Sequence, residues 1–189
     1  MMPLRNKDIL YDKPLIAYVE NFMTTDDCDK FIDFAKPKLK KSMVIEKGLI
    51  KADPSRNSSE VWIQTNKLKT NEFFRKNVSE FFDVPCNTFE TTIVINYKHG
   101  QQYRAHYDYD LHSSVKRRAT AICYLNNVAE GGETIFPDLN ISVKPKKGAL
   151  LYFQYDFDDE SINKKTLHAG SPVISNDEKW ITTIWMKKL

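Results

Sequence analysis

Two stretches in the first half of the chain carry apolar residues at helical spacing. Residues 24–41 begin with Thr24 or Thr25 as a helix cap, and Pro37 is expected to end or bend the helix. The apolar residues of this stretch share one face: Cys28, Phe31, Ile32 and Ala35. Residues 71–85 predict a second helix, with a stripe of Phe74, Val78, Phe81 and Phe82. We interpret both stripes as core rather than as cofactor-binding surfaces.

From about residue 90 the pattern changes to short segments rich in β-branched and aromatic residues. Turn-forming residues separate the segments TTIVINY, ATAICYLN, ETIF, GALLYFQ, PVIS and WITTIWM. Because no helix-length amphipathic stretch lies between them, an antiparallel sandwich or roll is favoured over parallel βαβ winding. We therefore predict one domain over residues 1–189 of the α+β class, mainly β, with a helical N-terminal layer over about residues 1–88 and a β-roll over about residues 89–189.

The composition is that of a soluble globular protein and disfavours several other classes. The chain has 189 residues, of which 41% are hydrophobic and 28% charged. A net charge of +3, without a basic stripe interleaved with aromatic residues, makes nucleic acid an unlikely partner. No stretch is apolar enough for a signal peptide or a membrane span. Three cysteines without a close pairing pattern favour a reducing compartment, so we expect a cytoplasmic or otherwise soluble intracellular protein.

The stretch YRAHYDYDLH contains residue types that can bind a metal ion. If it is extended, His106 and Asp108 point to the same side of a strand and can bind one metal ion. His168 precedes a later predicted strand, and Lys179 follows eleven positions beyond it. Two histidines and one carboxylate with open positions are the usual ligands of non-haem iron(II) oxygenases. A nearby lysine suits the far carboxylate of a dicarboxylic keto acid such as 2-oxoglutarate. The alternative is that these residues have no catalytic role: His106 and Asp108 would lie on the polar edge of a strand, His168 in a loop, and Lys179 on the surface.

Several motifs in the same order resemble the prolyl 4-hydroxylase family of Fe(II)/2-oxoglutarate dioxygenases, over nearly the whole chain. The strongest are INYKHGQQYRAHYDYD, RRATAICYLNNVAEGGETIFP, VKPKKGALLYF and LHAGSPVI followed by EKWITTIW. Upstream, RNSSEVWI and LIAYVENFMTTDDCDKFI are similar to the family's earlier segments. The resemblance implies a double-stranded β-helix, a cupin-like jelly-roll with helices packed outside.

The same resemblance implies a role for each candidate site residue. The Fe(II) ligands, which are also the catalytic residues, would be His106, Asp108 and His168. The residues that bind 2-oxoglutarate would be Lys179, Tyr97 and Thr134. Residues on the substrate side, where a structural role is equally compatible, are Tyr103, Arg117 and Trp185. The co-substrates would be 2-oxoglutarate and O2, with ascorbate as an additional cofactor of the family. The implied reaction hydroxylates prolyl residues of a peptide or protein while 2-oxoglutarate becomes succinate.

Other functions stay open at this point. One is a 2-oxoglutarate hydroxylase that acts on another amino acid or on a small molecule. Others, less favoured, are an oxidative nucleic-acid demethylase and a non-catalytic β-roll binding module. His99 and His112 lack a matching motif, and we expect both to face solvent. Arg56 and Trp62 belong to a segment that would lie over the site, without an assigned role.

Overall fold

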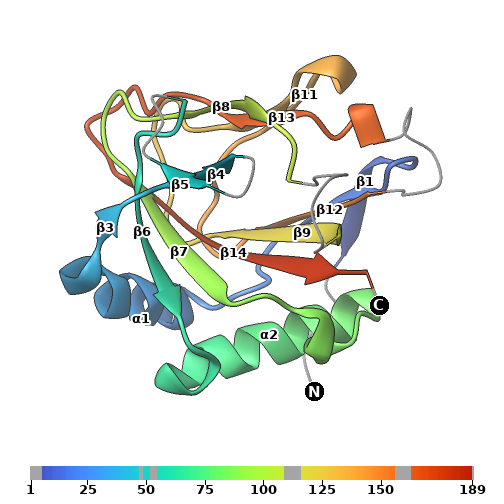
Figure 1. Ribbon diagram of the computed structural model, residues 1–189, viewed down its shortest axis with the longest axis horizontal. Helices are drawn as coiled ribbons and strands as arrows, with labels where there is room; N and C mark the ends of the chain where they lie inside the picture. The colour runs from blue at the N-terminus through green and yellow to red at the C-terminus, as the bar shows by residue number, and fades with distance from the viewer. Residues whose placement is uncertain (1–5, 47–48, 52–54, 109–115, 156–162, 189) are drawn as a thin grey trace.

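The computed structural model describes residues 6–46, 49–51, 55–108, 116–155 and 163–188 (Figure 1). Two antiparallel sheets carry most of this part of the chain. The larger sheet has the strand order β1 (Lys7–Tyr11), β2 (Ile16–Val19), β12 (Leu150–Gln154), β9 (Arg117–Tyr124), β14 (Lys179–Lys187), β7 (Thr92–Tyr97), β6 (Ser59–Ile63) and β3 (Lys40–Lys41). The smaller sheet has the order β11 (Ile141–Val143), β10 (Thr134–Phe136), β13 (His168–Gly170) and β8 (Tyr103–His106). A separate hairpin joins β4 (Val44–Glu46) to β5 (Leu49–Lys51).

The two predicted helices are present and lie along one face of the larger sheet (Figure 1). Helix α1 spans Thr25–Ala35, and its cap is Thr24, whose hydroxyl oxygen accepts a hydrogen bond from the Asp27 amide at 3.1 Å. Pro37 lies in the short 3₁₀ turn η1 (Lys36–Lys38) that follows, as expected of a helix stop. Helix α2 spans Lys69–Phe82 and ends at Asp83 in the left-handed conformation. Further 3₁₀ turns are η2 (Thr65–Lys67), η3 (Cys86–Thr88) and η4 (Pro137–Leu139).

Apolar side chains pack on both faces of the larger sheet. Between this sheet and the helices lies a cluster that includes Phe31, Phe74, Val78, Leu150 and Ile184. Between the two sheets lies a second cluster that includes Ile93, Ile122, Phe136, Leu151 and Phe153. Strand β14 pairs with β7 on one side and β9 on the other, so it runs through the middle of the sheet. The arrangement is a mainly β double-stranded β-helix, as the sequence predicted.

Two details differ from the sequence expectation. The PVIS segment is not a strand: only Val173 forms isolated bridges, to His99 and Gly131. Pro172 lacks an amide hydrogen, and the backbone of Gly131, at a φ of 77°, passes too close to the Pro172 carbonyl for any side chain at that position. The segment therefore packs against the turn at Gly131 and does not add a strand to either sheet. In addition, the first 88 residues are not only helical, because β1, β2, β3 and β6 extend the larger sheet.

Candidate functional site

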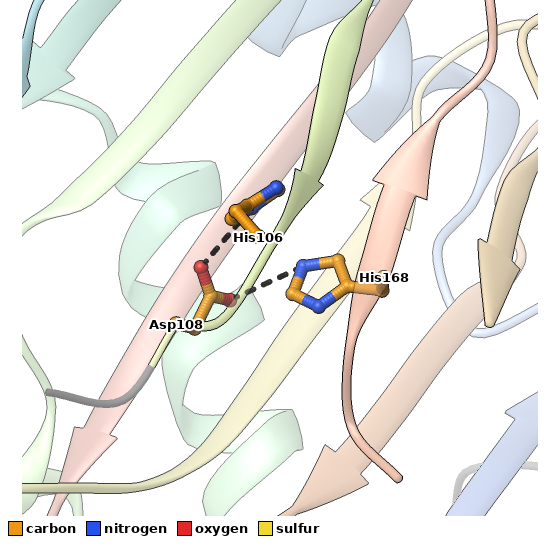
Figure 2. A group of neighbouring side chains, drawn as sticks. All are labelled: His106, Asp108 and His168. Atoms are coloured by element: carbon orange, nitrogen blue, oxygen red, sulfur yellow. Dashed lines mark ion pairs between the residues drawn. The ribbon is translucent and has the colours of Figure 1, made fainter. Parts of the chain in front are cut away.

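The histidines and the aspartate singled out in the sequence meet between β8 and β13 (Figure 2). His106 ends β8, Asp108 follows it by two residues, and His168 begins β13 directly opposite His106 in the antiparallel register. The Nε2 atom of His106 lies 3.5 Å from Asp108 Oδ1, and that of His168 lies 3.7 Å from Asp108 Oδ2. One potential ligand atom from each residue lies within 4.8 Å of the other two. His168 is thus brought beside His106 and Asp108, which are 62 and 60 residues earlier in the chain, and all three side chains can contact one small cation.

Backbone contacts orient both imidazole rings. His106 Nδ1 lies 2.8 Å from the Arg104 carbonyl oxygen, and His168 Nδ1 lies 3.0 Å from the Thr166 carbonyl oxygen. Because a carbonyl only accepts hydrogen bonds, each Nδ1 carries a proton, and the neutral form of each ring then has its lone pair at Nε2. Both Nε2 atoms point towards Asp108, which is the arrangement that metal-binding histidines need.

The charge of the aspartate is stabilised by its surroundings. Burial alone would raise the pKa of Asp108, but the two histidines and Arg117 hold that pKa well below its usual range. The Thr120 hydroxyl donates to Asp108 Oδ2 at 2.8 Å, and Arg117 Nη1 donates to the Asp108 carbonyl oxygen at 3.2 Å. Asp108 is therefore an ionised ligand whose position is fixed by the neighbouring strand β9.

The ring of His168 is neutral. Burial lowers the pKa of His168 to about 4, with a further lowering from His106 that Asp108 partly offsets. A neutral imidazole with a free Nε2 is the form that binds a metal. Two neutral imidazoles and one carboxylate leave a divalent cation with a net positive charge, so the bound ion still attracts an anionic co-substrate. The donor set therefore fits Fe(II).

All nine candidate residues from the sequence line one cavity of about 410 Å³: Tyr97, Tyr103, His106, Asp108, Arg117, Thr134, His168, Lys179 and Trp185. The volume lies within the usual range of small-molecule sites. The structure thus brings together strands from both sheets around one space. His99, by contrast, is exposed as expected, and His112 lies outside the described residues.

Lys179 has an unusual environment in this cavity. Its side chain is 2% exposed, and among the described residues it has no carboxylate within salt-bridge distance. The ammonium lies 5.3 Å from the ring centre of Tyr97 and 5.9 Å from that of Tyr124. Burial lowers the pKa of Lys179 to about 8, which Glu133 partly opposes. A buried cation of this kind is stabilised by an anionic ligand.

Gly132 gives the lysine side chain its room. Its φ of 72° suits glycine, and a Cβ at this position would lie 3.3 Å from Lys179 Cδ. Beside it, the buried Thr134 hydroxyl accepts a hydrogen bond from Tyr124 Oη at 2.9 Å. The Thr134 hydroxyl hydrogen is then available for an acceptor in the cavity.

The predicted substrate-side residues also support their neighbours. Arg117 forms two hydrogen bonds to Glu90, at 2.8 and 2.9 Å, and its guanidinium lies 4.0 Å from the ring centre of Trp185. Tyr103 stacks on the imidazole of His106, with ring centres 3.6 Å apart and planes 19° apart. Arg117 and Tyr103 therefore help to hold the metal-binding side chains, whatever they contact in a ligand.

Comparison with known proteins decides the family. The 2OG-Fe(II) oxygenase superfamily matches residues 92–187, which contain the triad and Lys179. The chain belongs to this superfamily. It is 32% identical to Probable prolyl 4-hydroxylase 10 of Arabidopsis thaliana, over 95% of this chain and 71% of the relative. It is also 32% identical to a putative prolyl 4-hydroxylase of Acanthamoeba polyphaga mimivirus, over 97% of this chain and 77% of that protein.

A solved structure gives the same result. The viral collagen prolyl hydroxylase of Paramecium Bursaria Chlorella virus-1, in complex with 2OG, superposes with a TM-score of 0.75 at 31% identity, covering 95% of this chain and 99% of that one. The protein is therefore a prolyl 4-hydroxylase-like 2OG-Fe(II) dioxygenase, which decides against a non-catalytic binding module. Fe(II) and 2-oxoglutarate are the cofactor and co-substrate implied by this superfamily. No helix among the described residues is long and apolar enough to cross a membrane.

Some residues of this oxygenase site were not singled out in the sequence. Strand β14 lines the cavity with every second residue, and this row includes Ile181 and Thr183 between Lys179 and Trp185. Within the described residues, the buried Thr183 hydroxyl and the Trp185 indole nitrogen have no hydrogen-bond partner. Strand alternation starting from Lys179 would have found Thr183. Glu90 also lines the cavity, but no sequence signal identifies it, because it is recognised only by its contact with Arg117 in the folded chain.

Proposed function

We propose that this dioxygenase hydroxylates prolyl residues in a peptide or protein, as a prolyl 4-hydroxylase. The observation that carries the proposal is the convergence of His106, Asp108 and His168 at the wall of a cavity that also contains the buried ammonium of Lys179. The three side chains are proposed to hold Fe(II) through two Nε2 atoms and the carboxylate. When bound, the iron supplies the redox chemistry by which O2 and 2-oxoglutarate give succinate, CO2 and one hydroxylated C–H bond.

The 2-oxoglutarate end of the cavity is proposed to lie at Lys179. Its ammonium pairs with the distal carboxylate, which compensates the cost of a buried charge. The Thr134 hydroxyl, fixed by the hydrogen bond from Tyr124, donates to the same ligand. Tyr97 is 4% exposed and lines the same end, and burial raises its pKa, so its phenol is protonated and can donate as well.

The peptide is proposed to enter beside Arg117, Trp185 and Tyr103. Arg117 directs three of its N–H groups to Glu90 and to the Asp108 carbonyl, which leaves other guanidinium hydrogens for a peptide carbonyl. The Trp185 indole N–H is a donor without a partner among the described residues, so it can bind a second carbonyl. Because the walls around the triad are largely apolar, they exclude bulk water from the reacting C–H bond.

Turnover measurements test this proposal. We expect wild-type protein to convert 2-oxoglutarate to succinate only with Fe(II), and mass spectrometry to place the added oxygen on proline within a panel of proline-containing peptides. The His106→Ala variant should lose the reaction. Equal, slow succinate release by wild type and variant would contradict it, and oxygen on another residue or on a small molecule would redirect it to that substrate. Ascorbate stays a prediction, tested by comparing total turnovers with and without it.

A further inference from the structure

The mouth of the cavity is unusually apolar for a surface. Among the described residues, the large apolar side chains that remain exposed include Met43 at 39%, Trp62 at 50% and Tyr107 at 39%. All three line the cavity that contains the triad. Exposed apolar side chains gathered at one opening mark a binding surface more often than scattered ones do. The opening is therefore suited to a partly apolar chain.

Trp62 is exposed but held in place. Its indole nitrogen donates to Glu60 Oε1 at 3.0 Å, and Glu60 Oε2 lies 2.7 Å from Arg56 Nη2. Arg56 and Glu60 are both buried, so this ion pair is a fixed anchor for the indole. An aromatic side chain ordered before binding loses little entropy when a ligand packs on it. Trp62 thus has the properties of a recognition residue.

The indole of Trp62 lies next to that of Trp185, on the solvent side of the cavity. Its ring centre lies 6.1 Å from that of Trp185, at an interplanar angle of 40°. Trp185 is 8% exposed and pairs in the sheet with Thr120, whose hydroxyl donates to Asp108. Both indoles line the cavity that contains the proposed metal ligands, so together they form an aromatic surface that runs from solvent into this cavity, which we call the tryptophan shelf (Trp62 and Trp185).

We propose that Trp62 determines sequence specificity by packing on the substrate residue two positions from the hydroxylated proline. This inference rests on the proposed function. A proline-rich peptide in the polyproline II conformation advances about 3.1 Å per residue, so two residues span about 6.2 Å. That span matches the 6.1 Å between the indole centres of the shelf. With the target ring beside Trp185, the second residue along the peptide lies at Trp62.

The chemistry of the shelf favours proline at that second position. A pyrrolidine ring offers a flat apolar face to an indole, and its fixed φ reduces the entropy lost on binding. Glycine offers no side chain to pack on Trp62 and is more flexible before binding. We expect peptides with proline two positions from the target to be preferred over the same peptides with glycine there.

Peptide binding and turnover by Trp62→Ala test the inference. The variant is expected to weaken peptide affinity about tenfold by calorimetry, and to raise the peptide KM by a similar factor rather than lower kcat. Trp62→Phe should recover most of the affinity. Phe73→Ala is the matched control, because Phe73 is 53% exposed on α2 and does not line the cavity, so its removal should leave the affinity unchanged.

A peptide with glycine at the second position completes the test. Wild type should lose about tenfold in affinity with this peptide, whereas Trp62→Ala should lose almost nothing more, because the contact is already absent. Unchanged peptide affinity in Trp62→Ala, or an undiminished preference for proline in that variant, would overturn the inference. Binding is measured separately from turnover. A wild type that binds through Trp62 but never oxidises 2-oxoglutarate would refute the proposed function and retain the role of Trp62 in binding.

Discussion

The two faces of strand β14 are similarly buried but differ in what their polar atoms contact. The face towards the helices contributes Trp180, Ile184 and Met186 to an apolar core. The face towards the smaller sheet lines the cavity with Lys179, Ile181, Thr183 and Trp185. Every one of these side chains is at most 8% exposed. Burial by itself therefore does not distinguish the core from the candidate active site.

Hydrogen bonding does distinguish the two faces. On the helix side, the Thr182 hydroxyl donates to the Ile93 carbonyl oxygen at 3.3 Å. On the cavity side, within the described residues, the Thr183 hydroxyl and the Trp185 indole N–H have no partner. Leaving such groups buried and unpaired costs about 1–3 kcal/mol each, and because these two groups face the cavity, we propose that a ligand supplies their partners. The same reasoning applies more strongly to the charged Lys179.

Removal of the Lys179 charge is expected to have the largest effect on the binding of 2-oxoglutarate. Lys179→Met should raise the KM for 2-oxoglutarate about 100-fold, because the distal carboxylate would be buried without a counter-charge. The free energy of unfolding without ligand should not fall, since the variant removes a buried ammonium that has no carboxylate within salt-bridge distance among the described residues. Steady-state kinetics and denaturant unfolding measure the two quantities.

Ile184→Ala on the opposite face is the matched control. It should cost about 3 kcal/mol of unfolding free energy through the cavity that it leaves, while the KM for 2-oxoglutarate stays the same. If Lys179→Met instead destabilised the protein with little change in KM, both faces of β14 would be core, and the proposed ligand role of Lys179 would be wrong.

The pH dependence of the KM for 2-oxoglutarate is a second test of Lys179 on the cavity face of β14, with a smaller expected effect than Lys179→Met. Burial lowers the pKa of Lys179 to about 8, so the ammonium that we propose binds the carboxylate is present below pH 8 and is lost above it. The KM for 2-oxoglutarate should be flat below pH 8 and rise about tenfold per pH unit above it. In Lys179→Arg, which stays charged, the rise should disappear. A rise that persists in this variant would assign the titration to another group.

Much of this architecture was predictable because local signals agree with the fold. Both helices were predicted from their apolar spacing, and the start of α1 from its threonine cap. The strands β7, β9, β10, β12 and β14 were predicted from runs of β-branched and aromatic residues between turns. The convergence of His106, Asp108 and His168 was expected from motif resemblance, since spacing in the chain alone does not bring residues 106 and 168 together.

What was missed depends on contacts that form only in the folded chain. The PVIS segment has side chains typical of a strand, but its backbone contacts the turn at Gly131 instead of a neighbouring strand. Strands β1 and β3 are short edge strands that carry little periodicity of their own. Thr183 differs from its neighbours because its buried hydroxyl has no hydrogen-bond partner in the part of the chain that the structure describes, and the sequence does not distinguish a paired threonine from an unpaired one.

Two adjacent threonines of β14 provide the smallest but most direct test. Thr183→Val removes a cavity-facing hydroxyl without a partner among the described residues, so the unfolding free energy should stay the same or rise by up to about 1 kcal/mol. If the hydroxyl binds ligand, kcat/KM for 2-oxoglutarate should fall about fivefold. Thr182→Val removes a hydroxyl that donates to Ile93, so it should lower stability by about 1 kcal/mol and leave kcat/KM unchanged. The two substitutions are chemically identical and one residue apart. Equal effects on stability and turnover would therefore show that the two faces do not differ in function.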